Sequence, residues 1–427
     1  GTAMNARDAT NWQALLARRF VAVRDATLAM LHGLSAEDCM LQSMAEASPV
    51  KWHLGHVAWF FETFVLEPRL PGHEPFDPAF RELFNSYYVG VGARHPRGER
   101  GLLSRPSLER VLAYQRSVSE RLLAWMGEEA LPAEALDLIE LGLQHEQQHQ
   151  ELIATDLKHH LWCNPLLPAW GSVPEGRTEV APGPLRFRRY DAALVGIGHA
   201  GDGFAFDNES PRHRVWTEAF ELADRPVSNG EYLAFIRDGG YERPDLWLSD
   251  GWDARCRQAW DMPLYWLRRA GDWYCYTSFG VQSLDEAEPV CHLSYYEADA
   301  YARWAGARLP TEQEWERAAA EAGIEEGDFA EAGVFHPRRL RPGCTAFLGG
   351  VWEWTQSAYL PYPGFRPAAG AVGEYNGKFM INQMVLRGGS CATPRSHLRT
   401  TYRNFFPPAS RWQYAGLRLA RSGDSHG

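Results

Sequence analysis

The sequence predicts a multidomain α+β protein: a four-helix bundle over residues 1–165, a linker over 166–184 and an irregular α+β domain over 185–422. Three observations lead to this prediction. Helical hydrophobic periodicity dominates the first part of the chain. A stretch dense in proline and glycine follows. After it, short aromatic segments alternate with turns. With 427 residues, the chain is long enough for more than one hydrophobic core.

The composition narrows the class of protein. Apolar residues make up 45% of the chain and charged residues 23%, as in ordinary globular proteins. A net charge of −11 argues against nucleic acid and anionic membrane surfaces as partners. The sequence has no run of apolar residues long enough to span a membrane. Its seven scattered cysteines, without a CxxC pair, favour a reducing cytoplasm.

Four helices are expected in the first domain. Asn11–Leu31 has amphipathic spacing, and a second helix begins around Ser48-Pro49, where serine can cap and proline suits the first turn. A third covers about Ser107–Met126, and a fourth after Pro132 includes Leu136–Leu161. A long connection between the second and third helices is compatible with a four-helix bundle, in which metal sites are built from inward-facing side chains.

The fourth helix carries His145 and His149, four residues apart. On a helix these positions share one face, so both imidazoles can bind one metal ion. The letters also match the H-E-x-x-H pattern of zinc proteases, in which Glu146 would be the general base. The extended protease pattern needs a glycine and a histidine where this chain has Leu152 and Thr155, so a protease is disfavoured.

The second helix offers a third ligand. It contains His53 and His56, which are three residues apart and are not expected to point equally well into the core. We favour His56 because Trp59 and Phe60 place the apolar face near it. Three histidines leave coordination positions open, which suits catalysis. Hydrogen-bonded core histidines without a metal are the alternative.

The connection between the second and third helices is long and rich in glycine, arginine and tyrosine, as functional loops often are. Arg94 and Arg97 could bind a carboxylate. Tyr87 or Tyr88 could present a phenol to chemistry at the metal. The alternative is that the tyrosines pack and the arginines form a solvated rim.

In the second domain, helices are expected at Ser228–Arg237, at Ser294–Ala305 and from Thr311 to about Ala320, the last two opened by capping boxes. The segments PVCHLSYYEADAYARWAGARLPTEQEWERAA, GGVWEWTQS, VLRGGS and YAGLRLA resemble the formylglycine-generating-enzyme, or sulfatase-modifying, family. That resemblance implies a C-type-lectin-like fold. It does not imply copper–thiolate chemistry, because Thr393 and Leu398 stand where formylglycine-forming members need cysteines.

The two halves together resemble the ergothioneine-biosynthetic sulfoxide synthases, non-haem iron enzymes with a DinB-like bundle before this lectin-like domain. WHLGHVAWFFE and HEQQHQE match the ligand segments of that family, and FAFDNESPRH is also typical of it. The resemblance implies Fe(II) bound by His56, His145 and His149. It also implies a reaction that uses O2 to join a thiol to C2 of the imidazole of Nα-trimethylhistidine (hercynine) and forms a sulfoxide.

The resemblance also implies a hercynine site. Gln148 would bind the substrate imidazole, and Asn404 with Phe405 would receive the trimethylammonium group, a cation suited to aromatic faces. Phe406 stands where members that use γ-glutamylcysteine tend to have an acidic residue, which favours free cysteine as the thiol donor.

Two further roles follow from the same likeness. Arg94 and Arg97 match the carboxylate-binding positions in their spacing from the first histidine. Tyr87-Tyr88 resembles the cysteine-using branch, so the phenolic proton donor is expected there rather than in the C-terminal domain.

Other functions remain open at this point. An ovothiol-type 5-histidylcysteine sulfoxide synthase would join cysteine to C5 of unmethylated histidine, and a selenium-transferring relative would share most motifs. A zinc-dependent thiol transferase would use the same three histidines, since zinc binds imidazole equally well. A non-catalytic metal- or ligand-binding scaffold would consume no O2.

Overall fold

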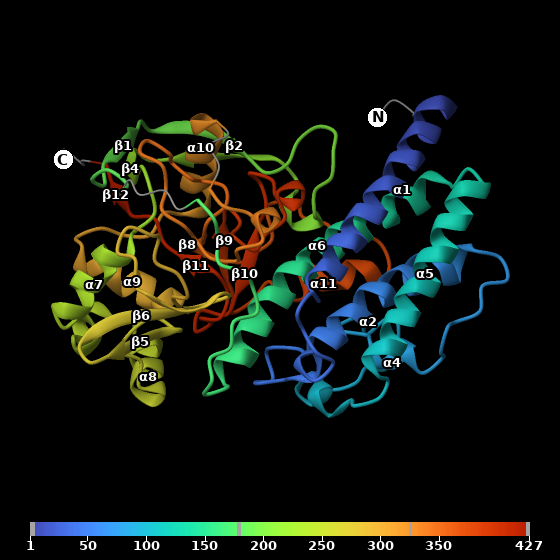
Figure 1. Cartoon of the computed structure of the whole chain (residues 1–427). Coiled ribbons are helices and arrows are strands. Elements are labelled where there is room, and N and C mark those ends of the chain that lie inside the picture. The colour runs from blue at the N-terminus through green and yellow to red at the C-terminus, as the bar shows by residue number, and fades with distance from the viewer. Residues whose placement is uncertain (1–4, 177–180, 324–326, 424–427) are drawn as a thin grey trace. The chain divides into compact units, whose positions relative to one another are not determined.

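The computed structural model describes residues 5–176, 181–323 and 327–423 (Figure 1). Two compact units make up the chain. The first comprises Gly1–Cys163 with Ala369–Tyr375, and the second comprises Asn164–Ala368 with Asn376–Gly427. The first unit is helical and the second mixes helices with short strands, so the predicted fold class is confirmed.

The first unit contains the four long helices expected from the periodicity. Its helices are α1 (Ala6–Ala29), α2 (Val50–Phe61), α3 (Glu67–Arg69), α4 (Phe80–Leu83), α5 (Leu108–Glu128) and α6 (Ala133–Trp162). Helix α2 packs against α5 and α6, and α1 packs against α6. A single π-helical turn, Glu62–Leu66, follows α2. Ser107 caps α5 by accepting a hydrogen bond from the Arg110 N–H.

Every residue of α2 is buried. A helix that is buried on all sides lies in the interior of a domain. The few polar side chains on α2 must therefore form hydrogen bonds inside the protein. The expected cap by Ser48 is not formed: Pro49 stands at the N-cap and no side chain caps the helix. The Ser48 hydroxyl instead accepts a hydrogen bond from Arg100 Nη1 at 2.8 Å.

Glycine allows α6 to approach α2 closely. A Cβ atom on Gly142 of α6 would lie 2.5 Å from the ring of Phe61 at the end of α2. Real Cβ atoms do not come so near an aromatic carbon, so only glycine fits without moving Phe61. The face of α6 that carries His145 and His149 is thereby held against α2.

The second unit contains helices α7 (Asn229–Arg237), α8 (Ser249–Gln258), α9 (Tyr295–Trp304) and α10 (Glu312–Ala322), and α11 (Glu374–Gly377) spans a boundary between the two units. Capping boxes begin α7, α9 and α10 at Ser228, Ser294 and Thr311, which confirms the three predicted helices. Helix α8 was not predicted. Its segment, SDGWDARCRQ, has aspartate and glycine in the first turn and little helical apolar spacing, so no pattern indicated it.

The strands of the second unit are short. They are β1 (Phe187–Tyr190), β2 (Ala193–Ile197), β3 (His213–Thr217), β4 (Phe220–Ala223), β5 (Trp266–Arg269), β6 (Asp272–Thr277), β7 (Gly280–Ser283), β8 (Trp352–Ala358), β9 (Met384–Arg387), β10 (Asn404–Phe406), β11 (Ala415–Gly416) and β12 (Ala420–Ser422). They form sheets in the orders β1-β4-β12, β10-β9-β8-β11, β2-β3 and β5-β6-β7. The pairs are antiparallel except β8 with β11, which is parallel.

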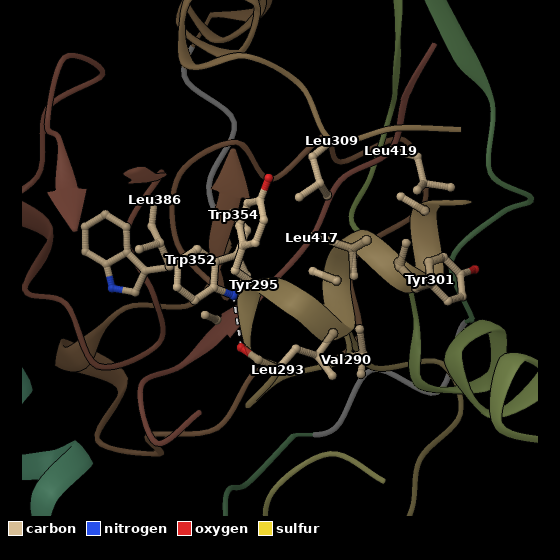
Figure 2. Close-up of a cluster of buried hydrophobic side chains, with 14 of the residues drawn as sticks. Val290, Leu293, Tyr295, Tyr301, Leu309, Trp352, Trp354, Leu386, Leu417 and Leu419 are labelled. Atoms are coloured by element: carbon tan, nitrogen blue, oxygen red, sulfur yellow. Dashed lines mark hydrogen bonds between the residues drawn. The ribbon is translucent and has the colours of Figure 1, made fainter. Parts of the chain in front are cut away.

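The core of the second unit gathers around α9 and β8 (Figure 2). Trp352 and Trp354 on β8 are almost completely buried. The indole N–H of Trp354 donates to the Leu293 carbonyl at 2.9 Å, just before α9 begins. Buried indoles of this kind combine a large apolar area with a satisfied polar group, which fixes the sheet against the helix.

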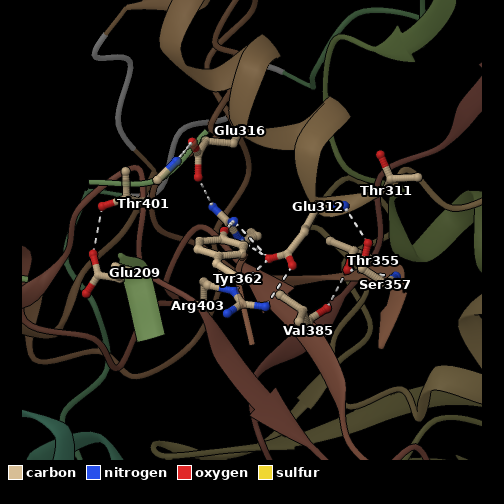
Figure 3. Close-up of polar contacts among 12 residues, drawn as sticks. Glu209, Thr311, Glu312, Glu316, Thr355, Ser357, Tyr362, Val385, Thr401 and Arg403 are labelled. Atoms are coloured by element: carbon tan, nitrogen blue, oxygen red, sulfur yellow. Dashed lines mark hydrogen bonds and ion pairs between the residues drawn. The ribbon is translucent and has the colours of Figure 1, made fainter. Parts of the chain in front are cut away.

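A buried charge network lies at the start of α10 (Figure 3). The Glu312 carboxylate accepts hydrogen bonds from Arg387 and Arg403, each at 2.9 Å for its shortest contact. Glu316 accepts a further hydrogen bond from Arg387 at 2.9 Å. These charges are nearly inaccessible to solvent, and each has a partner, as burial of charge requires.

Candidate metal centre

The three histidines predicted as ligands lie together inside the first unit. His56 comes from α2, and His145 and His149 come from one face of α6. All three are buried, and one ring nitrogen of each lies within 4.8 Å of those of the others. Two helices that are far apart in the sequence therefore contribute nitrogen donors to one cluster.

The ring of His56 is fixed on three sides. It stacks on Trp52 at 4.7 Å and on Trp59 at 5.4 Å between ring centroids. His56 Nδ1 lies 2.6 Å from the Phe84 carbonyl oxygen, which can only accept, so Nδ1 carries the hydrogen. A neutral His56 therefore has its lone pair on Nε2.

His145 is held by packing rather than by a polar partner. Its ring stacks on Phe60 at 4.6 Å with an interplanar angle of 25°. Its Nδ1 has no hydrogen-bond partner among the described residues, and its Nε2 lies 3.0 Å from His56 Nε2. Two facing Nε2 atoms, one already shown to carry a lone pair, leave room for an ion that both can bind.

His149 has a polar neighbour that the sequence prediction did not include. His53, expected to point elsewhere, is also buried and lies beside His149, with 2.9 Å between the two Nδ1 atoms. His53 Nε2 lies 2.7 Å from the Asp156 carboxylate. The expectation that only one of the two α2 histidines faces the core is therefore wrong. Asp156, one turn after Leu152 on α6, carried no motif and was missed.

The three candidate ligands are neutral at ordinary pH. Burial lowers the pKa of His145 to about 3, with a smaller electrostatic contribution from the neighbouring His53 ring. Burial, followed by the charges of neighbouring histidines, also lowers the pKa values of His56 and His149 well below 6.5. Neutral imidazole is the form that binds metal.

These donors fit a first-row transition metal. Metal–nitrogen bonds of about 2.1 Å at right angles place two donor atoms about 3 Å apart. The 3.0 Å between Nε2 of His56 and Nε2 of His145 agrees with that spacing. Three imidazoles suit zinc, iron, copper or nickel and leave positions for other ligands. The structure thus provides a buried three-histidine site.

Glu146 is not part of this centre. Its carboxylate accepts hydrogen bonds from Arg24 and from Thr27 on α1. The resemblance to a zinc-protease helix therefore stops at the two histidines.

Gln148 is the half-buried residue in this turn of α6, whose neighbours His145, Gln147 and His149 are buried. A hydrogen bond joins its side chain to the phenol of Tyr375. This hydrogen bond lowers the pKa of Tyr375, but burial has the larger effect and raises that pKa far above 10. Tyr375 belongs to the late segment Ala369–Tyr375, which is part of the first unit although it follows most of the second unit in the sequence. No sequence motif singled it out.

In the loop between α4 and α5, the guanidinium groups of Arg94 and Arg97 both lie near the ring of Tyr87. Arg97 Nη1 donates to the Tyr87 hydroxyl at 2.6 Å, and the Tyr87 ring lies 6.0 Å from that of Tyr375. Arg94 donates to the Ser86 carbonyl at 3.1 Å. Both arginines are exposed, whereas Tyr88 is buried and stacks on Trp59 at 5.6 Å.

Asn404, Phe405 and Phe406 form β10 of the second unit. The Phe405 ring lies almost parallel to that of Tyr359, 4.2 Å away. Phe406 contacts Trp412 edge to face at 5.8 Å. The predicted trimethylammonium residues therefore sit on an aromatic-rich strand.

The chain matches two family models. Residues 19–153 match the DinB superfamily, and residues 178–342 and 338–423 match the sulfatase-modifying factor enzyme 1-like domain. The predicted bundle and lectin-like domain are both confirmed by these matches. Among the described residues, no helix is both long and apolar enough to cross a membrane.

Individual relatives extend the likeness over nearly the whole chain. A hercynine oxygenase of Mycolicibacterium thermoresistibile is 34% identical, covering 96% of this chain and 95% of that protein. A hercynine oxygenase of Mycobacterium tuberculosis is also 34% identical, covering 95% of this chain and 98% of that protein. PvdO from Pseudomonas aeruginosa, a solved structure, is 20% identical over 57% of this chain and 99% of its own, with a TM-score of 0.39.

Proposed function

Because the chain belongs to the hercynine oxygenase family, we propose that it joins cysteine to C2 of the imidazole of hercynine, with Fe(II) and O2, to give the hercynyl-cysteine sulfoxide of ergothioneine biosynthesis. The observation that carries this proposal is the buried cluster of His56, His145 and His149. Family membership makes the protein an O2-using oxidoreductase. The iron, the thiol and the residue roles below are our proposals.

Iron is the metal we assign to the three histidines. Bound there, Fe(II) would supply the one-electron chemistry that O2 requires. The protein's own contribution is to keep three imidazoles neutral and to bring one nitrogen of each within 4.8 Å of the others. Zinc would satisfy the same donors but has no redox chemistry, so it would inhibit rather than activate.

Hercynine carries a permanent trimethylammonium charge and an imidazole, and the chain has a matching group for each. We assign the cation to Asn404 and Phe405, because a quaternary ammonium is attracted to aromatic faces and Phe405 is stacked on Tyr359. We assign the imidazole to Gln148, whose amide both donates and accepts and lies one residue from His149.

Cysteine is the thiol donor we favour. The glutamyl group of γ-glutamylcysteine carries its own amino and carboxylate charges. Phe406 packs on Trp412 and has no charge with which to bind such a group. The exposed guanidinium groups of Arg94 and Arg97 would bind the carboxylate of cysteine.

The phenols near Gln148 are candidates for moving a proton. Tyr87 and Tyr375 lie next to each other, and Tyr375 is hydrogen-bonded to Gln148. Burial raises the pKa of Tyr375, so this phenol keeps its proton at neutral pH and is a weak acid until its surroundings change. Tyr88, the neighbour of Tyr87, is packed against Trp59, which favours a structural role. We therefore place the proton donor at Tyr87 or Tyr375 and retain Tyr88 as a third variant to test.

The test uses full-length protein purified without oxygen and loaded with one equivalent of Fe(II). Hercynine or histidine is supplied with cysteine or γ-glutamylcysteine, and O2 uptake and product mass are measured. We expect uptake and a C2 sulfoxide adduct with hercynine plus cysteine, and neither with His145→Ala or with zinc in place of iron.

Each other result has a definite meaning. A C5 adduct from histidine would assign the ovothiol reaction instead. Faster turnover with γ-glutamylcysteine would overturn the choice of thiol alone. Loss of all O2 uptake in iron-loaded protein, with every substrate pair, would overturn the oxygenase proposal.

A further inference from the structure

We propose that His53 and Asp156 are positioning residues that hold His149 in the tautomer whose Nε2 binds the metal. The proposal rests on the metal centre of the proposed function and adds two residues to it. Neither was predicted as a site residue from sequence. Both act through His149 and not through contact with a substrate.

The contacts form an unbroken chain from α2 to α6. Asp156 Oδ2 lies 2.7 Å from His53 Nε2, and His53 Nδ1 lies 2.9 Å from His149 Nδ1. Asp156 Oδ2 also accepts a hydrogen bond from the Ser48 N–H at 3.0 Å. His53, Asp156 and His149 are between 3% and 9% exposed, so water does not compete freely for these atoms.

The chemistry of the groups sets the direction of each hydrogen bond. An ionised carboxylate can only accept, so the hydrogen of His53 is on Nε2. A neutral His53 then has a bare Nδ1. Of the two Nδ1 atoms that face each other, that of His149 must carry the hydrogen and donate it. The lone pair of His149 is therefore on Nε2.

A buried cation supports the charge on Asp156. Arg100 is 4% exposed and lies 3.4 Å above the Trp52 ring. Its Nη1 donates to the Ser48 hydroxyl, and the Ser48 N–H donates to Asp156. Burial lowers the pKa of Arg100 to about 9, opposed by the charges of Tyr87 and Asp156. Asp156 is thus stabilised by one backbone donor and by a nearby positive charge.

His149 thereby resembles His56 in how it is prepared for a metal. The Phe84 carbonyl fixes the hydrogen on Nδ1 of His56, and the His53–Asp156 pair does so for His149. Hydrogen-bond partners of metal-binding histidines typically contribute about 10–100-fold to metal affinity, because they fix tautomer and ring orientation.

Two substitutions of His53 separate the two contacts it makes. In His53→Asn the amide oxygen can take the place of Nδ1 and accept from His149, but the contact with Asp156 is lost. In His53→Gln the amide nitrogen can take the place of Nε2 and donate to Asp156, but the acceptor for His149 is lost. The proposal predicts that His53→Asn retains metal affinity better and that His53→Gln retains the stability of the apoprotein better.

Two substitutions of Asp156 separate hydrogen bonding from charge. In Asp156→Asn the Ser48 N–H selects the oxygen of the new amide, so this oxygen still accepts from His53 and keeps the tautomers. Asp156→Leu has no acceptor, and His53 is then free to carry its hydrogen on Nδ1. We expect Asp156→Asn to bind metal within about threefold of the parent and Asp156→Leu to bind about 10–100-fold more weakly.

The probe is Co²⁺, titrated optically into full-length apoprotein against a chelator, with thermal unfolding of each apoprotein as the measure of stability. The expected result is an order of affinity, His53→Asn above His53→Gln, that is the reverse of the order of stability. Equal affinities within each pair of variants, or affinities that merely follow stability, would overturn the proposal. His149→Ala must lose Co²⁺ binding. If the unmodified protein itself bound no Co²⁺, the metal centre and the proposed function would fail together.

Discussion

Arg24 on α1 binds Glu146 on α6 through two guanidinium nitrogens, with Nη2 2.8 Å from Oε1 and Nε 3.0 Å from Oε2. Thr27 donates a third hydrogen bond to Oε2 at 2.7 Å. The glutamate that a zinc protease would use as a base is here a link between two helices. The sequence pattern H-E-x-x-H therefore occurs both in zinc proteases and in this helix. The hydrogen-bond partners of the glutamate distinguish the two cases.

The first prediction concerns this buried pair. Arg24→Met leaves the Glu146 carboxylate buried without its cation, and we expect the free energy of unfolding to fall by about 3–5 kcal/mol. Removing both charges in Arg24→Met/Glu146→Met should cost less than the single change, since no charge is then stranded. Urea unfolding of the apoproteins measures this. Both variants should still bind one Co²⁺, whereas loss of Co²⁺ binding by a folded double variant would place Glu146 in the metal centre.

The second prediction is that the affinity for metal decreases only slightly between pH 7.5 and pH 5.5. The folded pKa of His145 is about 3, and those of His56 and His149 are also well below 6.5. At pH 5.5, three histidines with ordinary pKa values would each be about 90% protonated and would lose about 1000-fold in affinity together. With the lowered values we expect only a few-fold loss of Co²⁺ affinity between pH 7.5 and 5.5. A loss near 1000-fold would contradict the neutral, buried state of these rings.

The same shifts give the opposite result for the stability of the apoprotein. The unfolded chain binds protons on these histidines below about pH 6.5, whereas in the folded chain the pKa of His145 is about 3 and those of His56 and His149 are well below 6.5. Their contribution to stability is therefore complete above pH 6.5 and is lost progressively as the pH falls towards 3. The free energy of unfolding of the apoprotein, followed by urea titration, should decrease through this window, and His145→Phe should reduce the slope.

Sequence patterns predicted the parts of the fold that follow local rules. The capping residues Ser228, Ser294 and Thr311 stand where the structure begins α7, α9 and α10. The i, i+4 spacing of His145 and His149 was sufficient to place both on one face. Such features depend only on neighbouring residues, so a single sequence contains them.

The missed features depend on contacts between distant segments. His53 has a polar partner because Asp156 lies across the helix interface, 103 residues later. Tyr375 reaches Gln148 because a short segment late in the chain belongs to the first unit. Ser48 was predicted to cap a helix. Its hydroxyl instead accepts a hydrogen bond from Arg100, and its N–H donates to Asp156. No periodicity or motif records these pairings.

The third prediction separates the three tyrosines. Removal of a positioned proton donor typically costs about 10²–10⁴-fold in rate. We expect Tyr375→Phe or Tyr87→Phe to slow sulfoxide formation by at least about 100-fold without changing Co²⁺ affinity. Tyr88→Phe should change the rate by less than about threefold, because its ring packing on Trp59 is preserved. Rates are measured with hercynine and cysteine under saturating O2. A large effect confined to Tyr88→Phe would return the role to that residue.

The last prediction concerns the second unit and its charge network (Figure 3). Arg403 is bound to the Glu312 carboxylate, and no other carboxylate among the described residues pairs with it. Arg387 differs because it is bound to both Glu312 and Glu316. Glu312→Gln therefore strands one buried guanidinium, whereas Glu316→Gln strands none. We expect Glu312→Gln to lower stability by about 3–5 kcal/mol and Glu316→Gln by roughly 1 kcal/mol, in the unfolding transition of the full chain.

Acid sensitivity provides a second measurement of the same network. Burial alone would raise the pKa of Glu312, but the charges of Arg403 and Arg387 outweigh it and lower the pKa below 4.5. The folded carboxylate thus holds its proton less tightly than the unfolded one. Its contribution to stability is complete above about pH 4.5 and is lost as the pH falls through the folded pKa. Between pH 5 and pH 3 the parent should therefore lose more stability than Glu312→Gln, which has no carboxylate to protonate there. Parallel loss in the two proteins would mean that Arg403 and Arg387 do not hold Glu312 ionised.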